Sequence, residues 1–355
     1  MIGQKKLEAE RNKRPLEPRY PTLVFSHLLQ TFYYDWWRVG TMKILLFADP
    51  GIDDSLAIIY ALMHPKIELM GIVTGYGNVS VNDATRNAAF LLALAGRTDI
   101  PVMRGTSQPL SGTHTIYYPE IHGPQGLGPI IPPEDFRADV SPFEIMFDII
   151  EKNIEDIVIV DVGRQTSLAF AYNLRPELME QVKEVYLMGG AFMVPGNVTD
   201  LAEANFWGDP IATNVILNQA KKVYITPLNV TNRAIVTRDM ATFIFNHTNS
   251  PYKYLIPAVT NYYATFYDQV MPGIDGSPVH DVFTLYYLLN KDKTYTIKRD
   301  VRIATVDGNK GLSVADMRMV YKEPEKEHYI ALDFDYNDFI ADFIRVNIGE
   351  VNGTV

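Results

Sequence analysis

Three aspartates stand close together in the segment Asp49–Asp54, which reads Asp-Pro-Gly-Ile-Asp-Asp. The segment directly follows an apolar run at 43–48, so we expect these carboxylates at the carboxyl end of a buried strand. Buried carboxylates repel one another unless a cation neutralises them, and oxygen ligands of this kind prefer calcium or magnesium. Helix capping explains one aspartate readily but three poorly. The segment therefore predicts a divalent-cation site.

Two glycine-containing segments come next along the chain. Residues 75–79 read Gly-Tyr-Gly-Asn-Val and include Asn78; they predict a turn, since glycine and asparagine tolerate positive φ. Residues 122–128 begin with His122 and form a glycine-rich loop that is too long for a simple turn. Loops of this kind often act as mobile lids over sites. Neither segment indicates a reaction by itself.

Two later clusters carry amides, a carboxylate and a His-Asp pair. Asn197, Glu203 and Asn205 follow an apolar run at 184–188, and each of these side chains can hold a sugar oxygen. His280 and Asp281 open a predicted helix. Such a pair is more often a capped helix start than a catalytic site. The amide and carboxylate cluster therefore predicts recognition of hydroxyl groups.

The elements that must position these residues alternate along the chain. Runs of Ile, Val and Leu recur at 43–48, 67–74, 157–162, 184–188 and 222–226. Amphipathic stretches lie between several of them, at 54–63, 82–95, 166–173 and 210–219. This alternation predicts an α/β fold, a mostly parallel central sheet with helices on both faces, in a single domain. Functional groups in such folds collect at the carboxyl ends of the strands.

The last third of the chain predicts a helical region at about 251–290, two β-like runs at 293–298 and 301–306, and a final helix over 336–346. Aromatic residues of the helical region, at 262–267, have helical spacing. Such spacing usually marks a buried face, so we expect these rings to fill the core rather than to stack on a ligand.

Residues 1–41 differ from the rest, because charge and proline give way to aromatics without a clear period. Met42 is followed at once by the first predicted strand. One interpretation is that the native protein begins at Met42, so that 42–355 is the catalytic domain. The other is a real N-terminal extension whose aromatics dock on the domain or on a partner. We favour the first.

Composition excludes several classes of protein. The formal net charge of −10 argues against nucleic-acid binding, which needs clustered positive charge. Without cysteine the chain has no disulfide, no zinc–thiolate site and no cysteine nucleophile. No stretch is apolar over the roughly 20 residues of a membrane helix, and the patch at 23–29 is too interrupted for a signal peptide. We therefore expect a cytoplasmic protein with no membrane partner.

Taken together, the clusters resemble the inosine–uridine-preferring nucleoside hydrolase family, in order from Lys43 to the C-terminal region. The matching motifs are Asp-Pro-Gly-x-Asp-Asp at 49–54, Gly-Asn-Val at 77–79, His-Gly-x-x-Gly-Leu at 122–127, Met-Gly-Gly-Ala at 188–191, Gly-Asn-Val-Thr at 196–199, Ala-Glu-x-Asn at 202–205 and His-Asp at 280–281. The resemblance implies a Rossmann-like fold, a homodimer or homotetramer, and hydrolysis of ribonucleosides to ribose and a free purine or pyrimidine base.

The same resemblance implies roles for single residues. Asp49, Asp54 and Asp281 would be calcium (Ca2+) ligands, together with the main-chain carbonyl of Thr166. Asp49 would act as general base toward a calcium-bound water. His280 would supply a proton to the leaving base. The ribose and its 5′ end would be bound by Asp53, Asn197, Glu203 and Asn205. Asn78 would lie beside the metal and the ribose, and His122 near the base.

Five positions depart from the family pattern. Phe47 stands where the family usually has an aspartate. In the family this aspartate is expected to lie behind the metal ligands, so this chain lacks a negative charge near the metal. Ser167 replaces an asparagine and Asn229 an aspartate. The family also usually reads Gly-Pro-Leu at 163–165, where this chain has Gly-Arg-Gln. We expect an active hydrolase whose preferred nucleobase the sequence does not name.

Three other functions have weaker support in the sequence. Phe47 motivates a catalytically weak nucleoside- or pentose-binding homologue, against which the retained aspartates argue. An aspartyl phosphatase needs an Asp-x-Asp spacing that is absent around Asp49. A nucleoside phosphorylase needs a phosphate cradle, and Arg164 is the only basic residue close to a motif.

Overall fold

A mixed eight-stranded sheet forms the centre of the computed structural model, which describes residues 40–318 and 324–349. The strand order is β3-β2-β1-β4-β5-β6-β12-β9. The bounds are β1 Met42–Ala48, β2 Ile67–Thr74, β3 Val102–Arg104, β4 Ile157–Asp161, β5 Val185–Met188, β6 Lys222–Thr226, β12 Glu327–Phe334 and β9 Thr294–Lys298. Only β9 pairs antiparallel in this sheet, so the predicted mostly parallel α/β fold is confirmed.

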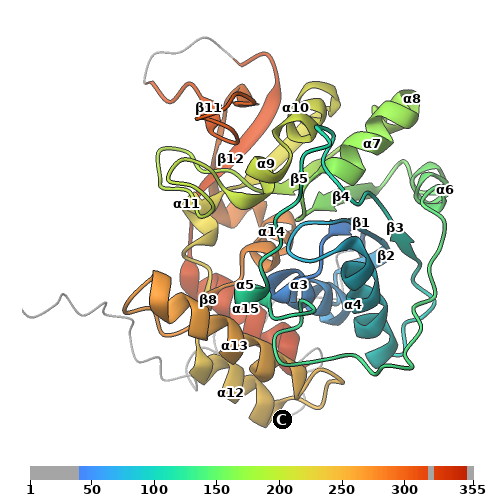
Figure 1. The fold of residues 1–355 in the computed structure, drawn as a ribbon, viewed down its shortest axis with the longest axis vertical. Coiled ribbons are helices and arrows are strands. Elements are labelled where there is room, and N and C mark those ends of the chain that lie inside the picture. Colours follow the sequence, from blue (N-terminus) through green and yellow to red (C-terminus); the bar gives the residue numbers. More distant parts are fainter. Residues whose placement is uncertain (1–39, 319–323, 350–355) are drawn as a thin grey trace, which may run out of the picture.

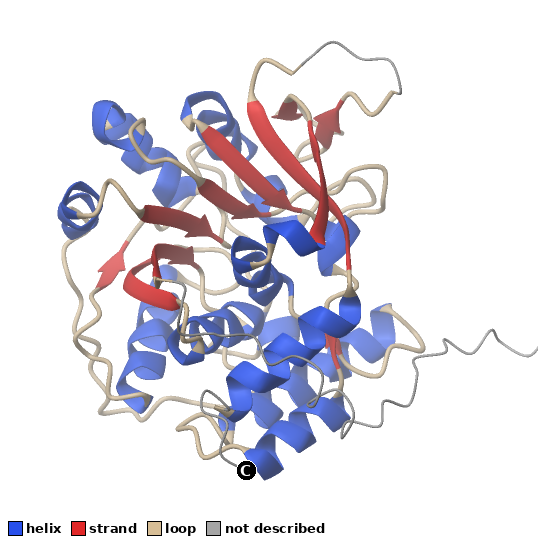
Figure 2. Ribbon diagram, turned by 180° about the vertical axis from the view of Figure 1, so that it is seen from behind, coloured by secondary structure: helices blue, strands red, loops and turns tan. Residues whose placement is uncertain are grey.

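Helices cover both faces of the sheet (Figure 1; Figure 2). One face carries α3 Ile52–Met63, α4 Val81–Leu94, α12 Arg238–His247, α13 Leu255–Val270, α14 His280–Leu289 and α15 Tyr336–Ile348. The other carries α6 Ile145–Lys152, α7 Thr166–Leu174, α8 Pro176–Met179 and α10 Pro210–Gln219. Strand β1 contributes side chains to the apolar cores on both faces of the sheet. Ile44 and Leu46 pack on the face that α3 and α14 cover, and Leu45 and Phe47 pack on the face that α7 and α10 cover.

Short elements complete the description. They are α5 Pro119–His122, α9 Ala204–Gly208, α11 Leu228–Thr231, the 3-10 helix η2 Lys291–Lys293, and the strand pairs β7 Ile235–Val236 with β8 Ser277–Pro278 and β10 Val301–Ile303 with β11 Ser313–Ala315. Among the helices of residues 40–318 and 324–349 we find no candidate for a membrane-spanning segment. Residues 1–39 lie outside the described range, so the expectation about an N-terminal extension at 1–41 stays a prediction.

The strand order places a crevice beside Asp49. The order in which strands are added to the sheet reverses at β1: β2 and β3 follow on one side of it, and β4, β5 and β6 on the other. Such a switch point opens a crevice at the carboxyl ends of the strands. Hydrogen bonds continue past the strand ends: the Val162 N–H donates to the Phe47 carbonyl at 2.9 Å, and the Gly75 N–H to the Ala48 carbonyl at 2.8 Å. The loops after β2 and β4 are thereby fixed on either side of Asp49.

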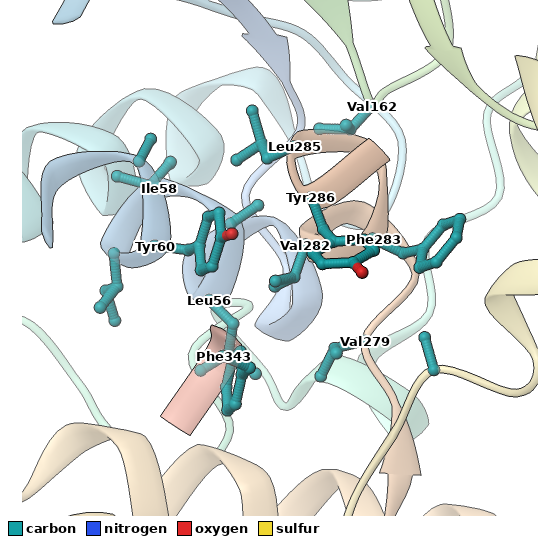
Figure 3. Close-up of a cluster of buried hydrophobic side chains, with 14 of the residues drawn as sticks. Leu56, Ile58, Tyr60, Val162, Val279, Val282, Phe283, Leu285, Tyr286 and Phe343 are labelled. Carbon is teal, nitrogen blue, oxygen red and sulfur yellow. The ribbon is translucent and has the colours of Figure 1, made fainter. Parts of the chain in front are cut away.

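Helices α3 and α14 pack against each other beneath this crevice. Leu56 and Tyr60 of α3 lie across from Val282 of α14, with Phe343 of α15 beside them (Figure 3). All four side chains are buried. Because the first turns of α3 and α14 carry the aspartates of the two acidic motifs, this apolar contact sets the distance between them.

Truncation of Leu56 tests how much this contact contributes. Leu56 is 1 % exposed, so Leu56→Ala leaves a cavity and should lower the free energy of unfolding by ~2–5 kcal/mol. Val270→Ala is the control, because Val270 lies on a helix but is 52 % exposed; its effect should stay within ~0.5 kcal/mol. Urea unfolding followed by circular dichroism measures both. Equal effects would contradict the packing described.

Candidate active site

Three carboxylates from two helix starts converge in the crevice. Asp53 and Asp54 lie in the first turn of α3 and Asp281 in the first turn of α14. Each offers an oxygen, and these oxygens lie within 4.8 Å of one another. All three residues are buried. The chain thus brings together acidic groups from segments more than 200 residues apart.

Asp49 lies beside this triad. Its N–H donates to Asp54 Oδ1 at 3.0 Å, and its Oδ2 accepts the Asn78 N–H at 2.6 Å. Asn78 Nδ2 in turn donates to Asp54 Oδ2 at 2.8 Å. Gly77 passes so close that a Cβ at this position would collide with Asp49 Oδ2. The Gly-Asn-Val turn therefore has a defined task, which is to hold Asp49 and Asp54 in place.

Burial makes the negative charge of this cluster costly. It raises the pKa of Asp53 to about 8, and repulsion from Asp54 adds to the effect. The pKa of Asp49 and that of Asp281 are raised well above the usual range for the same two reasons, burial first and neighbouring carboxylates second. Asp49 Oδ1 and Asp53 Oδ1 are buried without a hydrogen-bond partner among the described residues. Buried carboxylate oxygens without hydrogen-bond partners are hard ligands, and such a cluster fits a divalent cation such as calcium.

A second wall of the cavity comes from the loop after β5. Glu203 caps α9: its carboxylate accepts the N–H groups of Asn205, Phe206 and Gly190 at 2.7, 3.1 and 2.9 Å. Asn197 Oδ1 accepts the Ala204 N–H at 2.9 Å. Asn197, Glu203 and Asn205 nevertheless all line the cavity that Asp53 and Asp281 line. The predicted sugar-binding cluster and part of the acidic cluster thus share one space.

Aromatic side chains also line this cavity. His280 Nε2 lies 3.0 Å from the Tyr267 hydroxyl, and His280 Nδ1 lies 2.8 Å from Thr231 Oγ1. Burial lowers the pKa of His280 to about 4, so it is neutral at neutral pH. Tyr263 packs edge-on against Tyr267, with ring centroids 5.0 Å apart. Tyr263, Tyr267 and His280 all line the cavity. The expectation that these tyrosines only fill the core was incomplete, because they are buried and also line the site.

His122 anchors the glycine-rich loop as well as lining the cavity. Its Nδ1 accepts the Ile52 N–H at 3.1 Å, and burial lowers its pKa to about 3. Asn87 fixes the same loop, because its Nδ2 donates to the carbonyls of Pro50 and Gln125 at 3.0 and 2.6 Å. The loop is therefore joined to the start of α3 at two points.

Thr166 does not line this cavity. Its hydroxyl donates to Asp209 Oδ2 at 2.8 Å and lies 2.9 Å from the Tyr76 hydroxyl, in a small neighbouring cavity. Val162, four residues earlier, does line the acidic cavity, and its carbonyl accepts Asn205 Nδ2 at 2.8 Å. The position of the loop after β4 therefore favours Val162 over Thr166 as a main-chain contact to the site.

Phe47, Ser167 and Asn229, three of the departures from the family pattern, do not line this cavity. Phe47 is 2 % exposed and packs in the core on the α7 side of the sheet. Ser167 Oγ accepts the Thr106 N–H at 3.0 Å. Asn229 makes two hydrogen bonds to the main chain of Phe192, at 3.0 and 2.8 Å, and so supports the loop after β5. Each departure has a structural partner.

Arg164 is the charged neighbour that sequence reasoning did not place. Its Nε lies 3.9 Å from Asp49 Oδ2, its Nη1 donates to the Ala204 carbonyl, and its guanidinium lies 5.8 Å from the Tyr118 ring centre. Tyr118 also lines the cavity. The only available signal was a basic residue next to a motif, which gives no hint of which carboxylate it meets.

Comparison with known proteins agrees with this arrangement. Residues 44–341, more than half of the chain, match the inosine-uridine preferring nucleoside hydrolase family. Uridine nucleosidase 1 of Arabidopsis thaliana is 33% identical over 265 residues, which cover 74% of this chain and 78% of that protein. The pyrimidine-specific ribonucleoside hydrolase RihA of Escherichia coli is 32% identical over 278 residues, which cover 78% and 88%. The solved structure of a plant nucleoside hydrolase, PpNRh1, has a TM-score of 0.80 at 28% identity and covers 86% of this chain and 98% of its own. The chain therefore belongs to the inosine-uridine preferring nucleoside hydrolase family and is an enzyme that cleaves N-glycosidic bonds.

Proposed function

We propose that this chain hydrolyses ribonucleosides to ribose and a free base with the help of a bound calcium ion. One observation carries the proposal: buried carboxylates and sugar-type amides line one cavity, which Asp53, Asp281 and Asn197 share. The names of two relatives, a uridine nucleosidase and a pyrimidine-specific hydrolase, make uridine the first substrate to test. A homo-oligomer and a cytoplasmic location stay predictions from the sequence.

The cation would be held by Asp49, Asp54 and Asp281, with Asp53 alongside. Bound there, it would lower the pKa of a water molecule and grip the ribose hydroxyls. A main-chain carbonyl would complete the set, and Val162 is better placed for this than Thr166 because it lines the cavity. Support for calcium comes from the donors, which are all hard oxygens.

Asp49 is assigned as the general base. The Asn78 N–H occupies its Oδ2, whereas its buried Oδ1 has no partner among the described residues and can accept a proton from water. Burial and Asp54 raise the pKa of this carboxylate, and Arg164 and the Asn78 N–H oppose that rise by favouring the ionised form. As the N-glycosidic bond breaks, positive charge develops on the ribose. The surrounding carboxylates stabilise that charge electrostatically.

His280 and Tyr267 are assigned to the leaving base. The two residues are in hydrogen-bond contact and line the same cavity as Asn197, Glu203 and Asn205, which would hold the 5′ end of the ribose. A proton relayed through this pair would neutralise the departing base. Since His280 is neutral at neutral pH, one of its ring nitrogens carries a proton that it can pass to the departing base, and the Tyr267 hydroxyl beside Nε2 can return a proton to the ring before it is itself reprotonated from solvent.

No residue of the cavity favours the alternative of a catalytically weak binding homologue. Phe47, which motivated it, packs in the core outside the cavity. The proposal of a hydrolase therefore stands on the site itself.

Removal of divalent cations tests the metal requirement. Ribose release from uridine and inosine should fall to background after treatment with EGTA, because the carboxylate cluster then lacks its neutralising charge. Excess calcium should restore the rate, and magnesium serves as the comparison ion. Full turnover after thorough chelation would contradict the use of a metal.

Substitution of Asp49 tests the general base. Asp49→Ala should lower kcat for uridine by ~10²–10⁴-fold, because the attacking water loses its proton acceptor. Asp200→Ala is the matched control, since Asp200 is an exposed aspartate of the loop after β5. Steady-state kinetics at saturating calcium measures both variants. An Asp49→Ala enzyme as fast as the control would refute the assignment.

A change of leaving group tests the role of His280. His280→Ala should slow hydrolysis of uridine by ~10²–10⁴-fold but affect p-nitrophenyl riboside little, because nitrophenolate leaves without a proton. Tyr267→Phe keeps the ring and removes only the hydroxyl, so it should show the same contrast. Equal losses on both substrates would mean that His280 acts on something other than the leaving group.

A further inference from the structure

A buried carboxylate that the proposed chemistry does not use lies at the end of β4. Asp161 is 2 % exposed. It is the register partner of Phe47 on β1, so the two side chains lie on the same face of the sheet. Asp161 Oδ1 accepts the Gly163 N–H at 3.0 Å, while its Oδ2 is buried without a hydrogen-bond partner among the described residues.

The turn that Asp161 begins makes three contacts with the site. Val162 lines the acidic cavity. Gly163 passes close to Asp49, since a Cβ at this position would lie 3.0 Å from Asp49 Oδ1. Arg164 Nε lies 3.9 Å from Asp49 Oδ2. A small displacement of this turn would therefore change the surroundings of both oxygens of Asp49.

The turn is held in a conformation that needs support. Gln165 has φ 60°, a left-handed conformation that is uncommon outside glycine. Its side chain donates to the Gly163 carbonyl and accepts the Thr213 hydroxyl at 3.2 Å. The bond from the Gly163 N–H to Asp161 is thus one of a small set of contacts that fix residues 162–165 against Asp49.

The surroundings of Asp161 do not fully satisfy its carboxylate. Asp161 lines a small cavity together with Phe47 and Arg164, and its Oδ2 is buried there without a hydrogen-bond partner among the described residues, which is costly. Phe47 stands where the family pattern usually has an aspartate, so β1 carries no carboxylate at this level. Asp161 returns a carboxylate to this level of the sheet, on the adjacent strand and beside the same aspartate cluster.

We propose that Asp161 is a positioning residue, which holds the turn at 162–165 against Asp49 and thereby sets the affinity of the acidic cluster for its divalent cation. The inference rests on the proposed function, because it concerns the same cation. Asp161 acts through the Gly163 N–H and not by contact with substrate.

Calorimetric titration of the chelator-stripped full chain with calcium tests this. Asp161→Ala removes the acceptor and should weaken calcium binding by ~10–100-fold. Asp161→Asn keeps an acceptor oxygen for the Gly163 N–H and should bind calcium nearly as well as the unchanged chain. Asp156→Ala is the control, because Asp156 is an exposed aspartate just before β4 and should leave the affinity unchanged. Should Asp161→Ala not fold, Asp161→Leu removes the acceptor while keeping the volume.

Kinetics separates positioning from structural damage. Saturating calcium should restore most of the kcat of Asp161→Ala, whereas a misfolded site would stay slow at any calcium concentration. The inference would be overturned if Asp161→Ala bound calcium as tightly as the unchanged chain, or if Asp161→Asn bound it as weakly as Asp161→Ala. In either case the unchanged chain would still hydrolyse uridine, so the proposed function would stand. If the unchanged chain neither binds calcium nor releases ribose, the proposed function fails, and the inference with it.

Discussion

Repulsion among buried carboxylates is the constraint on which the rest of this structure depends. Asp49, Asp53, Asp54 and Asp281 meet in one crevice, where burial raises the pKa of all four and repulsion from neighbouring carboxylates raises those of Asp49, Asp53 and Asp281 further. The protein offsets part of this cost with main-chain N–H groups, with Arg164 near Asp49 and with the positive ends of two helices. None of these supplies the two full positive charges that a divalent cation brings. An arrangement that costs stability in the free protein is therefore well suited to bind an ion.

The fold explains how distant segments reach this crevice. In a parallel sheet the carboxyl ends of the strands lie at one edge, and the reversal of the strand order at β1 leaves space there. The acidic segment follows β1, the Gly-Asn-Val turn follows β2, and the turn at 162–165 follows β4. Helix α14 arrives from the far end of the chain and is aligned by its apolar contact with α3. Packing on one face of the sheet thus controls chemistry at its edge.

Much of this could be predicted from local patterns. The strands β1, β2, β4, β5 and β6 and the helices between them follow from apolar runs and amphipathic periods, and their positions agree within a few residues. Strand β12 was missed, because its alternation is weaker and polar residues flank it. The predicted helical region at 251–290 is two helices, α13 and α14, separated by a segment that contains Pro272, Gly273 and Pro278. Pro272 and Gly273 directly follow the end of α13, so this break has a local signal in the sequence that the prediction did not use.

Site residues were predictable where a motif carries them and not where only the fold brings them in. Asp53, Asp54 and Asp281 were singled out by sequence and lie together. Arg164, Val162 and Asp161 carry no such signal, because their importance comes from the register of β4 against β1. For Thr166 the motif match was misleading. Thr166 lines a neighbouring cavity, and Val162, four residues earlier in the same loop, lines the cavity of the acidic cluster.

A crystal structure of the full chain grown with calcium, with anomalous diffraction recorded at long wavelength, tests most directly whether these carboxylates bind a divalent cation. We expect one strong anomalous peak among Asp49, Asp54 and Asp281, at about 2.3–2.6 Å from their carboxylate oxygens. A map with no peak among these carboxylates at saturating calcium would contradict this expectation, since the cluster would then be stabilised by protons alone.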